Sequence, residues 1–182
     1  MTNSINIYLL VATVICVLVA AIIDVLSHRI PNWLTFPTAA LGLLINFQLE
    51  GIQGLVFSVL GLATGFFLLF VVYMLGGMGA GDVKLLCAVG ALLGPKLVFC
   101  TFIWMALAGG ALAIVLIIYK KAFAQTLRNL KILLLGWLLR APSEEANLTI
   151  RNQSLIKLPY GVAIAVGAVL AVYFRGIPSF GF

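Results

Sequence analysis

The chain has 182 residues, of which 64% are hydrophobic and 9% are charged, and its mean hydropathy is +1.22. A hydrocarbon core about 30 Å thick takes about 20 apolar residues per helical crossing, so this composition indicates an integral membrane protein and excludes a large soluble domain or a separate nucleotide-binding domain. Eleven basic and five acidic residues give a net charge of +6, which we interpret as membrane topology and lipid contact, not nucleic-acid binding.

Apolar runs separated by turn residues predict an all-α polytopic membrane protein with about six spans. In chain order the predicted spans cover residues 5–26, 33–49, 54–75, 83–94, 97–119 and 158–175. The first run has no basic segment ahead of it and no small-residue cleavage site after it, so we expect it to be retained. The prediction is therefore a single membrane domain over residues 1–182.

The only long polar connection covers residues 120–157 and holds seven of the eleven basic residues. The positive-inside rule places this connection in the cytoplasm, which with six spans puts both termini outside. Within it, residues 122–139 mix polar side chains with many leucines. This pattern predicts an interfacial amphipathic helix, with a seventh span as the alternative.

The three cysteines lie in apolar runs, at Cys16, Cys87 and Cys100, and no two of them have the CxxC spacing of a zinc site or a redox pair. We interpret them as small core residues. The sequence also lacks a cluster of metal-ligand residues, so neither a metal nor a cofactor is predicted.

Two acids, Asp24 and Asp82, are embedded in apolar sequence. A carboxylate within the membrane costs free energy, so a functional or structural role is expected for each of them. Asp24 lies near the end of the first predicted span, and Asp82 follows the glycine-rich residues 76–81 at the start of the fourth. Under the predicted topology both carboxyl groups reach the same depth on the cytoplasmic side. The glycines before Asp82 permit irregular backbone, which is tolerated at membrane depth only where it lines an enclosed or watery cavity.

Two carboxyl groups in a partly dry site cannot both ionise easily, so one keeps a proton and the other can act as a base toward water. Such a pair suits the attack of water on a peptide carbonyl. Two alternatives stay open. Each acid could mark the membrane edge or pair with a nearby base, Asp24 with Arg29 and Asp82 with Lys84, or the two could form a proton or cation relay in a small transporter or channel.

Three separated motifs stand out, DVLSHRIPN at residues 24–32, GAGDVK at residues 79–84 and LPYG at residues 158–161. The first resembles the D-x5-IPN element of the type IV prepilin peptidases, and the second matches the GxGDxK element of this family. Residues 158–161, LPYG, are similar to the P-[FY]-G segment that begins the family's last helix. The resemblance implies a GxGD-type intramembrane aspartic endopeptidase that removes the short basic leader from prepilins or prepilin-like proteins on the cytoplasmic side of the bacterial inner membrane.

The resemblance carries the family's two catalytic aspartates over to Asp24 and Asp82. Gly79 and Gly81 are then expected as the backbone positions that place Asp82. Residues two apart do not share a helix face, so we expect Lys84 to meet an acidic substrate residue or a lipid phosphate, or to act as a topology residue, instead of pairing with Asp82. A last group of residues is expected to pack beside the site on the strength of the motif alone: Pro159, Tyr160 and Gly161.

One departure from the family pattern concerns the N-terminal region. Larger members begin with a cytoplasmic domain whose paired CxxC motifs bind zinc and which is linked to N-methylation of the new amino terminus. This chain begins with an apolar run and has no CxxC, so methyltransferase activity is not expected. Its length and the sequence of residues 77–84, GMGAGDVK, resemble those of the short peptidases of tight-adherence (Flp pilus) systems, with an archaeal preflagellin peptidase as the alternative. The expected partners are a prepilin-like substrate and membrane lipid.

Overall fold

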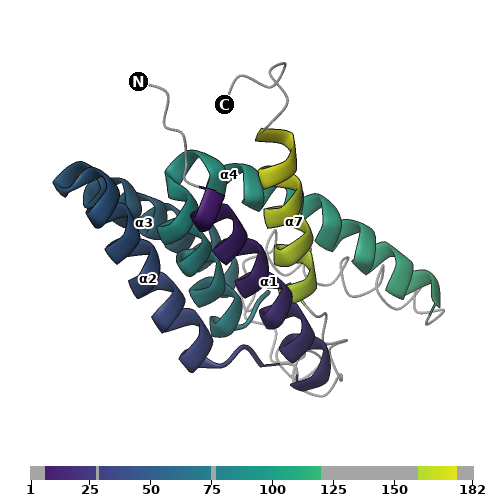
Figure 1. Ribbon diagram of the computed structural model, residues 1–182. Helices are drawn as coiled ribbons and strands as arrows, with labels where there is room; N and C mark the ends of the chain where they lie inside the picture. Colours follow the sequence, from purple (N-terminus) through teal and green to yellow (C-terminus); the bar gives the residue numbers. More distant parts are fainter. Residues whose placement is uncertain (1–6, 28, 75–76, 120–159, 176–182) are drawn as a thin grey trace, which may run out of the picture. The chain divides into compact units, whose positions relative to one another are not determined.

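The computed structural model describes residues 7–27, 29–74, 77–119 and 160–175, and every regular element among them is an α-helix. In chain order the helices are α1 (Ile7–Ser27), α2 (Asn32–Glu50), α3 (Ile52–Met74), α4 (Ala80–Tyr119) and α7 (Tyr160–Arg175) (Figure 1). Three stretches, α1, α3 and the Ala80–Val115 part of α4, are long and apolar enough to cross a membrane, and α7 is a shorter apolar helix. For the described residues, the prediction of an all-helical protein with several membrane helices is confirmed.

The described parts of the six predicted segments fall in these five helices, with residues 83–94 and 97–119 forming the two arms of α4, while only the three stretches above meet the length and hydropathy of a membrane span. The described residues up to Gly109 form one compact unit together with α7, and residues 110–119 belong to a second unit. The basic connection at 120–157, with the interfacial helix predicted at 122–139, lies outside the described residues, as does Pro159.

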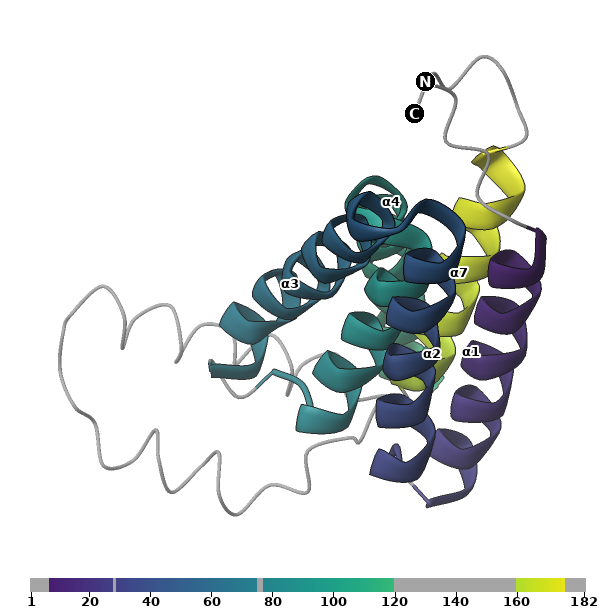
Figure 2. The same ribbon diagram turned by 60° about the vertical axis from the view of Figure 1, so that its left-hand side comes forward.

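The first three helices are joined by short turns that contain proline and glycine. Pro31 caps the start of α2 with a φ of −75°, which is the value its ring imposes. Gly51 separates α2 from α3 with a φ of 59°, and its N–H donates to the carbonyl of Phe47 at 2.8 Å. Glycine adopts such a positive φ without strain because it has no Cβ, and the two helices are therefore joined by a short turn and pack against each other (Figure 2).

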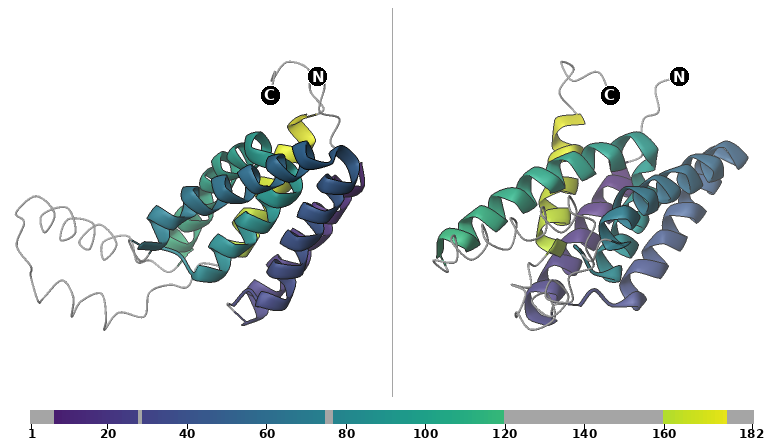
Figure 3. Two further views of the ribbon diagram at one scale, coloured as in Figure 1. Left: turned by 90° about the vertical axis from the view of Figure 1, so that its left-hand side faces the viewer. Right: turned by 180° about the vertical axis from the view of Figure 1, so that it is seen from behind.

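Helix α4 changes direction at Gly94, the one residue inside it with non-helical backbone angles, φ 77° and ψ 178° (Figure 3). The next residue, Pro95, has no N–H to donate to the carbonyl of Ala91, four residues earlier. That carbonyl instead accepts hydrogen bonds from two buried side chains, the amide of Asn46 on α2, at 3.1 Å, and the hydroxyl of Ser58 on α3. The carbonyl left without a backbone donor by the predicted break at Gly94-Pro95 thus accepts hydrogen bonds from neighbouring helices, as a polar backbone group at membrane depth requires.

Small residues let α3 lie backbone to backbone against α4. A Cβ atom added to Gly61 would lie 2.0 Å from the carbonyl oxygen of Gly90, and one added to Gly65 would lie 2.6 Å from that of Leu86. Close approach at small residues is the usual way in which helices associate where lipid removes the hydrophobic driving force. This packing holds the first arm of α4 in place.

The core joins the middle of α4, on both sides of its kink at Gly94, to α1 and α7, which lie side by side (Figures 1 and 2). Its buried members come from all three helices: Leu9, Val17, Val89, Leu92, Leu93, Leu97, Ala165 and Ala168. This core holds the three helices together, and the polar residues described below lie at the end of α1 and the beginnings of α4 and α7.

Candidate active site

Asp24 and Asp82, far apart in the sequence, are brought together at one end of the helices. Asp24 lies in the last turn of α1 and is 6% exposed, while Asp82 lies in the first turn of α4 and is 7% exposed. The two carboxyl groups are close enough to interact electrostatically. Two carboxyl groups this close in a buried site do not both ionise easily, so one can keep its proton while the other is a carboxylate.

Asp82 is held by the glycine that precedes its helix. The N–H of Gly79 donates to Oδ2 of Asp82 at 3.1 Å, and the N–H of Asp82 donates to the carbonyl of Gly79 at 3.2 Å. The first bond is the half of a capping box in which the third residue of a helix reaches back to the N-cap, and the second is a backbone bond of the first helical turn. The start of α4 therefore fixes one carboxyl oxygen of Asp82.

Asp24 is held by the start of α7. The N–H of Gly161 donates to Oδ2 of Asp24 at 2.8 Å. A Cβ atom on residue 161 would lie 2.8 Å from the Cβ and 2.9 Å from Oδ2 of Asp24, so this approach requires glycine. Each acid thus lies at the N-terminus of a helix, where the free N–H groups and the positive end of the helix dipole partly offset the cost of burying a carboxylate.

Tyr160, the first residue of α7, is half-buried and lies close enough to Asp82 to interact with it electrostatically. The start of α7 therefore contributes to both acids, through Gly161 at Asp24 and through Tyr160 at Asp82. Tyr160 and Gly161 of the third motif thus lie beside the two acids, whereas its first two residues, Leu158 and Pro159, are outside the described residues.

The segment between α1 and α2 and the beginning of α2 each contact the beginning of α4. Gly81 packs on Ile30, with space of only 3.1 Å between an added Cβ and the Cβ of Ile30. Lys84 donates from Nζ to Oδ1 of Asn32 at 2.9 Å, and the same ammonium lies 5.4 Å from the ring centroid of Phe36, within cation–π range. The first two motifs are therefore in direct contact.

The partner of Lys84 was missed by sequence reasoning, although Asn32 is the last residue of the DVLSHRIPN motif. Within the described ranges, no ion pair joins Lys84 to Asp82 or Arg29 to Asp24, so the simple pairing alternative is not what the structure shows there. The same ranges contain no group of three or more His, Cys, Asp or Glu residues that could hold a metal ion. What the site offers is two carboxyl groups, two backbone N–H donors and a phenol.

Comparison with known proteins identifies the family. A family model described as the type IV leader peptidase family matches residues 11–114, a range that includes Asp24, Asp82 and Lys84 and ends before α7. Searches of the curated proteins and of the solved structures found no match. Two buried acids at membrane-helix ends suit an aspartic peptidase, the activity that this family implies. Because the match covers more than half of the chain, the protein belongs to the type IV leader peptidase family.

Proposed function

We propose that this protein is a membrane-embedded aspartic endopeptidase that removes the short basic leader from type IV prepilins or prepilin-like proteins, with Asp24 and Asp82 as its catalytic pair. The observation that carries the proposal is the meeting of these two buried acids, which lie within the region matched to the family. In each aspartate, one carboxyl oxygen accepts a hydrogen bond from a backbone N–H. The second carboxyl oxygen of each aspartate then remains for water or substrate.

In the proposed reaction, one carboxylate accepts a proton from water as the water oxygen bonds to the scissile carbonyl carbon. The protonated partner meanwhile donates a hydrogen bond to the carbonyl oxygen. When the intermediate collapses, the carbon–nitrogen bond breaks, the nitrogen takes a proton from the acid, and the leader leaves with a new carboxyl terminus. General acid–base assistance of this kind contributes typically about 10²- to 10⁴-fold in rate. Tyr160 borders the pair and contributes to its polar surroundings.

We also propose that the site faces the cytoplasm of a bacterial inner membrane, with six spans and both termini outside. Arg29 and Lys84 follow the two acids within five residues in the sequence, and the basic connection at 120–157 adds charge of the same sign, which the positive-inside rule assigns to the cytoplasmic side. A basic leader would be cut at that face. Within the family, the sequence of residues 77–84, GMGAGDVK, favours the tight-adherence (Flp pilus) type over the preflagellin type.

The test is cleavage of a co-expressed prepilin by wild type, Asp24→Asn and Asp82→Asn, followed by gel shift and N-terminal sequencing. Both variants should lose at least about 100-fold in cleavage rate, since each removes a group that handles a proton. Glu50→Gln is the matched control, because Glu50 is an exposed acid at the far end of α2. If either aspartate variant, at normal abundance in membranes, cleaves at the wild-type rate, the proposed mechanism is wrong. A proton or cation relay then becomes the better explanation of the two acids.

A further inference from the structure

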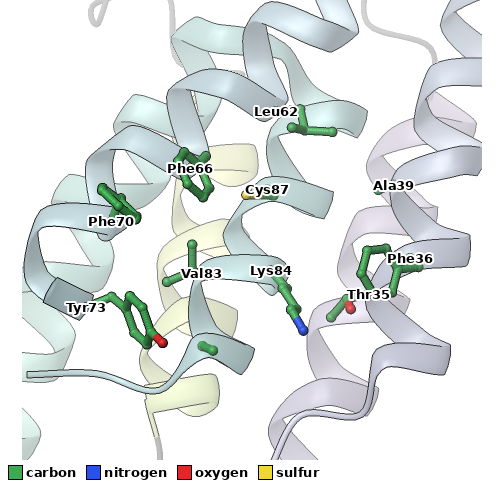
Figure 4. A pocket seen from close by; sticks show the side chains of 11 residues that line it. Thr35, Phe36, Ala39, Leu62, Phe66, Phe70, Tyr73, Val83, Lys84 and Cys87 are labelled. Carbon is green, nitrogen blue, oxygen red and sulfur yellow. The ribbon is translucent and has the colours of Figure 1, made fainter. Parts of the chain in front are cut away.

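An apolar groove opens beside Asp82, between α2, α3 and the first arm of α4 (Figure 4). The cavity has a volume of about 310 Å³, which is within the range of pockets that hold small ligands or a few side chains. Aromatic and aliphatic residues dominate its lining, among them Phe36, Phe66, Phe70 and Val83. Several of these rings are partly exposed, so the groove is open to an occupant.

Polar atoms gather at one end of this groove. Figure 4 shows the amine of Lys84 and the hydroxyl of Tyr73 at the end where α4 begins, while Leu62 and Phe66 lie farther along. Val83 and Lys84 directly follow Asp82 in the first turns of α4. The polar end of the groove therefore reaches the first turns of α4, which also carry Asp82, although Asp82 itself does not line the groove. The apolar length of the groove leads away from these turns.

We propose that this groove binds the apolar residues that follow the scissile bond in the substrate, an inference that rests on the proposed function. Its position at the first turns of α4 allows a chain held at Asp82 to pass around this helix end into the groove. Its charge selects which side of the bond enters: the ammonium of Lys84, held by Asn32 and Phe36, repels the basic leader. An uncharged apolar segment meets no such repulsion and finds a lining of matching character.

The first experiment fills the groove. Ala39 lines it, whereas Ala40, one position further along α2, is exposed and outside it. Ala39→Phe should lower kcat/KM at least about tenfold for a substrate with large apolar residues after the scissile bond. A substrate with alanines there should recover most of that loss, because it needs less of the groove. Ala40→Phe should cleave both substrates as the wild type does.

The second experiment uses Cys87, which lies in the groove (Figure 4). In an Asp24→Asn background that retains substrate, Cys16→Ala and Cys100→Ala leave Cys87 as the single thiol. Single cysteines placed along a prepilin should form disulfides with Cys87 only from positions after the scissile bond. The matched protein that keeps only Cys100, which does not line the groove, should form none of these crosslinks.

The outcomes separate this inference from the proposed function. Disulfides to Cys87 from the leader would overturn the inference, because the groove would then hold the other side of the bond. Equal cleavage by Ala39→Phe and Ala40→Phe, with a photoactivatable phospholipid labelling the groove in place of substrate, would overturn it in favour of a lipid site. In both cases cleavage by the parent protein leaves the proposed function standing. A parent protein that cleaves no prepilin would instead contradict the proposed function itself.

Discussion

Gly161→Ala tests how closely the site depends on its glycine contact with Asp24. The added Cβ would lie 2.8 Å from the Cβ of Asp24 and 2.9 Å from its Oδ2, whereas ordinary van der Waals contact begins at 3.4 Å. The difference between 3.4 and 2.8 Å requires the two groups to separate by about 0.6 Å. Both belong to packed helices, so the carboxyl group cannot simply rotate into free space.

A separation of this size would lengthen the hydrogen bond from the Gly161 N–H to Asp24 from 2.8 Å to about 3.4 Å, beyond the normal range for N–H···O bonds. A hydrogen bond to a charged group is worth about 1.5–3 kcal/mol. If the bond positions Asp24 in the transition state, its loss corresponds to about a 10- to 150-fold fall in kcat/KM. Misplacement of a reacting group by about 1 Å carries a penalty of similar size.

The assay measures leader cleavage by purified protein and thermal unfolding in the same detergent. Gly109→Ala is the matched control, since its added Cβ would meet only the Cβ of Ala163, at an ordinary 3.6 Å. The control should cleave at the wild-type rate. Gly161→Ala combined with Asp24→Asn should lose no more activity than Asp24→Asn alone, because the two changes act through one group. A folded Gly161→Ala protein that cleaves as fast as the control would refute the reasoning.

Two further predictions concern the break in α4. Asn46→Ala and Ser58→Ala each remove one of two donors from the buried carbonyl of Ala91, so each should lower the free energy of unfolding by about 0.5–1.5 kcal/mol; unchanged stability in both would mean that this carbonyl does not need them. Gly94→Ala should be severely destabilising in thermal unfolding, because its Cβ would lie 1.9 Å from the ring of Phe57 and its φ of 77° disfavours an L side chain. Adding Phe57→Ala should relieve the clash and leave a backbone penalty of about 1–3 kcal/mol, because these angles are almost restricted to glycine; a double variant no more stable than the single one would place the damage elsewhere.

Much of the fold is visible in the sequence because its causes are local. Runs of apolar residues long enough for a membrane make helices, and Pro31, Gly51 and Gly94-Pro95 interrupt them where the backbone is constrained. The two acids stand out for an equally local reason, since a carboxylate within apolar sequence is costly. Composition and these costs together indicate a membrane protein with a polar site.

The contacts that build the site depend on packing between residues far apart in the chain. Nothing local to Gly161 shows that its N–H meets Asp24, and nothing local to Lys84 shows that its partner is Asn32. Pro95 predicts that a carbonyl will lose its donor, yet only the packing of α2 and α3 on α4 shows which side chains replace it.

The sequence by itself determined where helices form and which side chains are too polar for their surroundings, because both follow from the free energy of single segments in lipid. Only the tertiary structure decided which helix ends meet, because that depends on how small residues let backbones approach. The groove beside Asp82 is likewise a product of packing, formed where aromatic side chains of α3 leave space against α2 and α4.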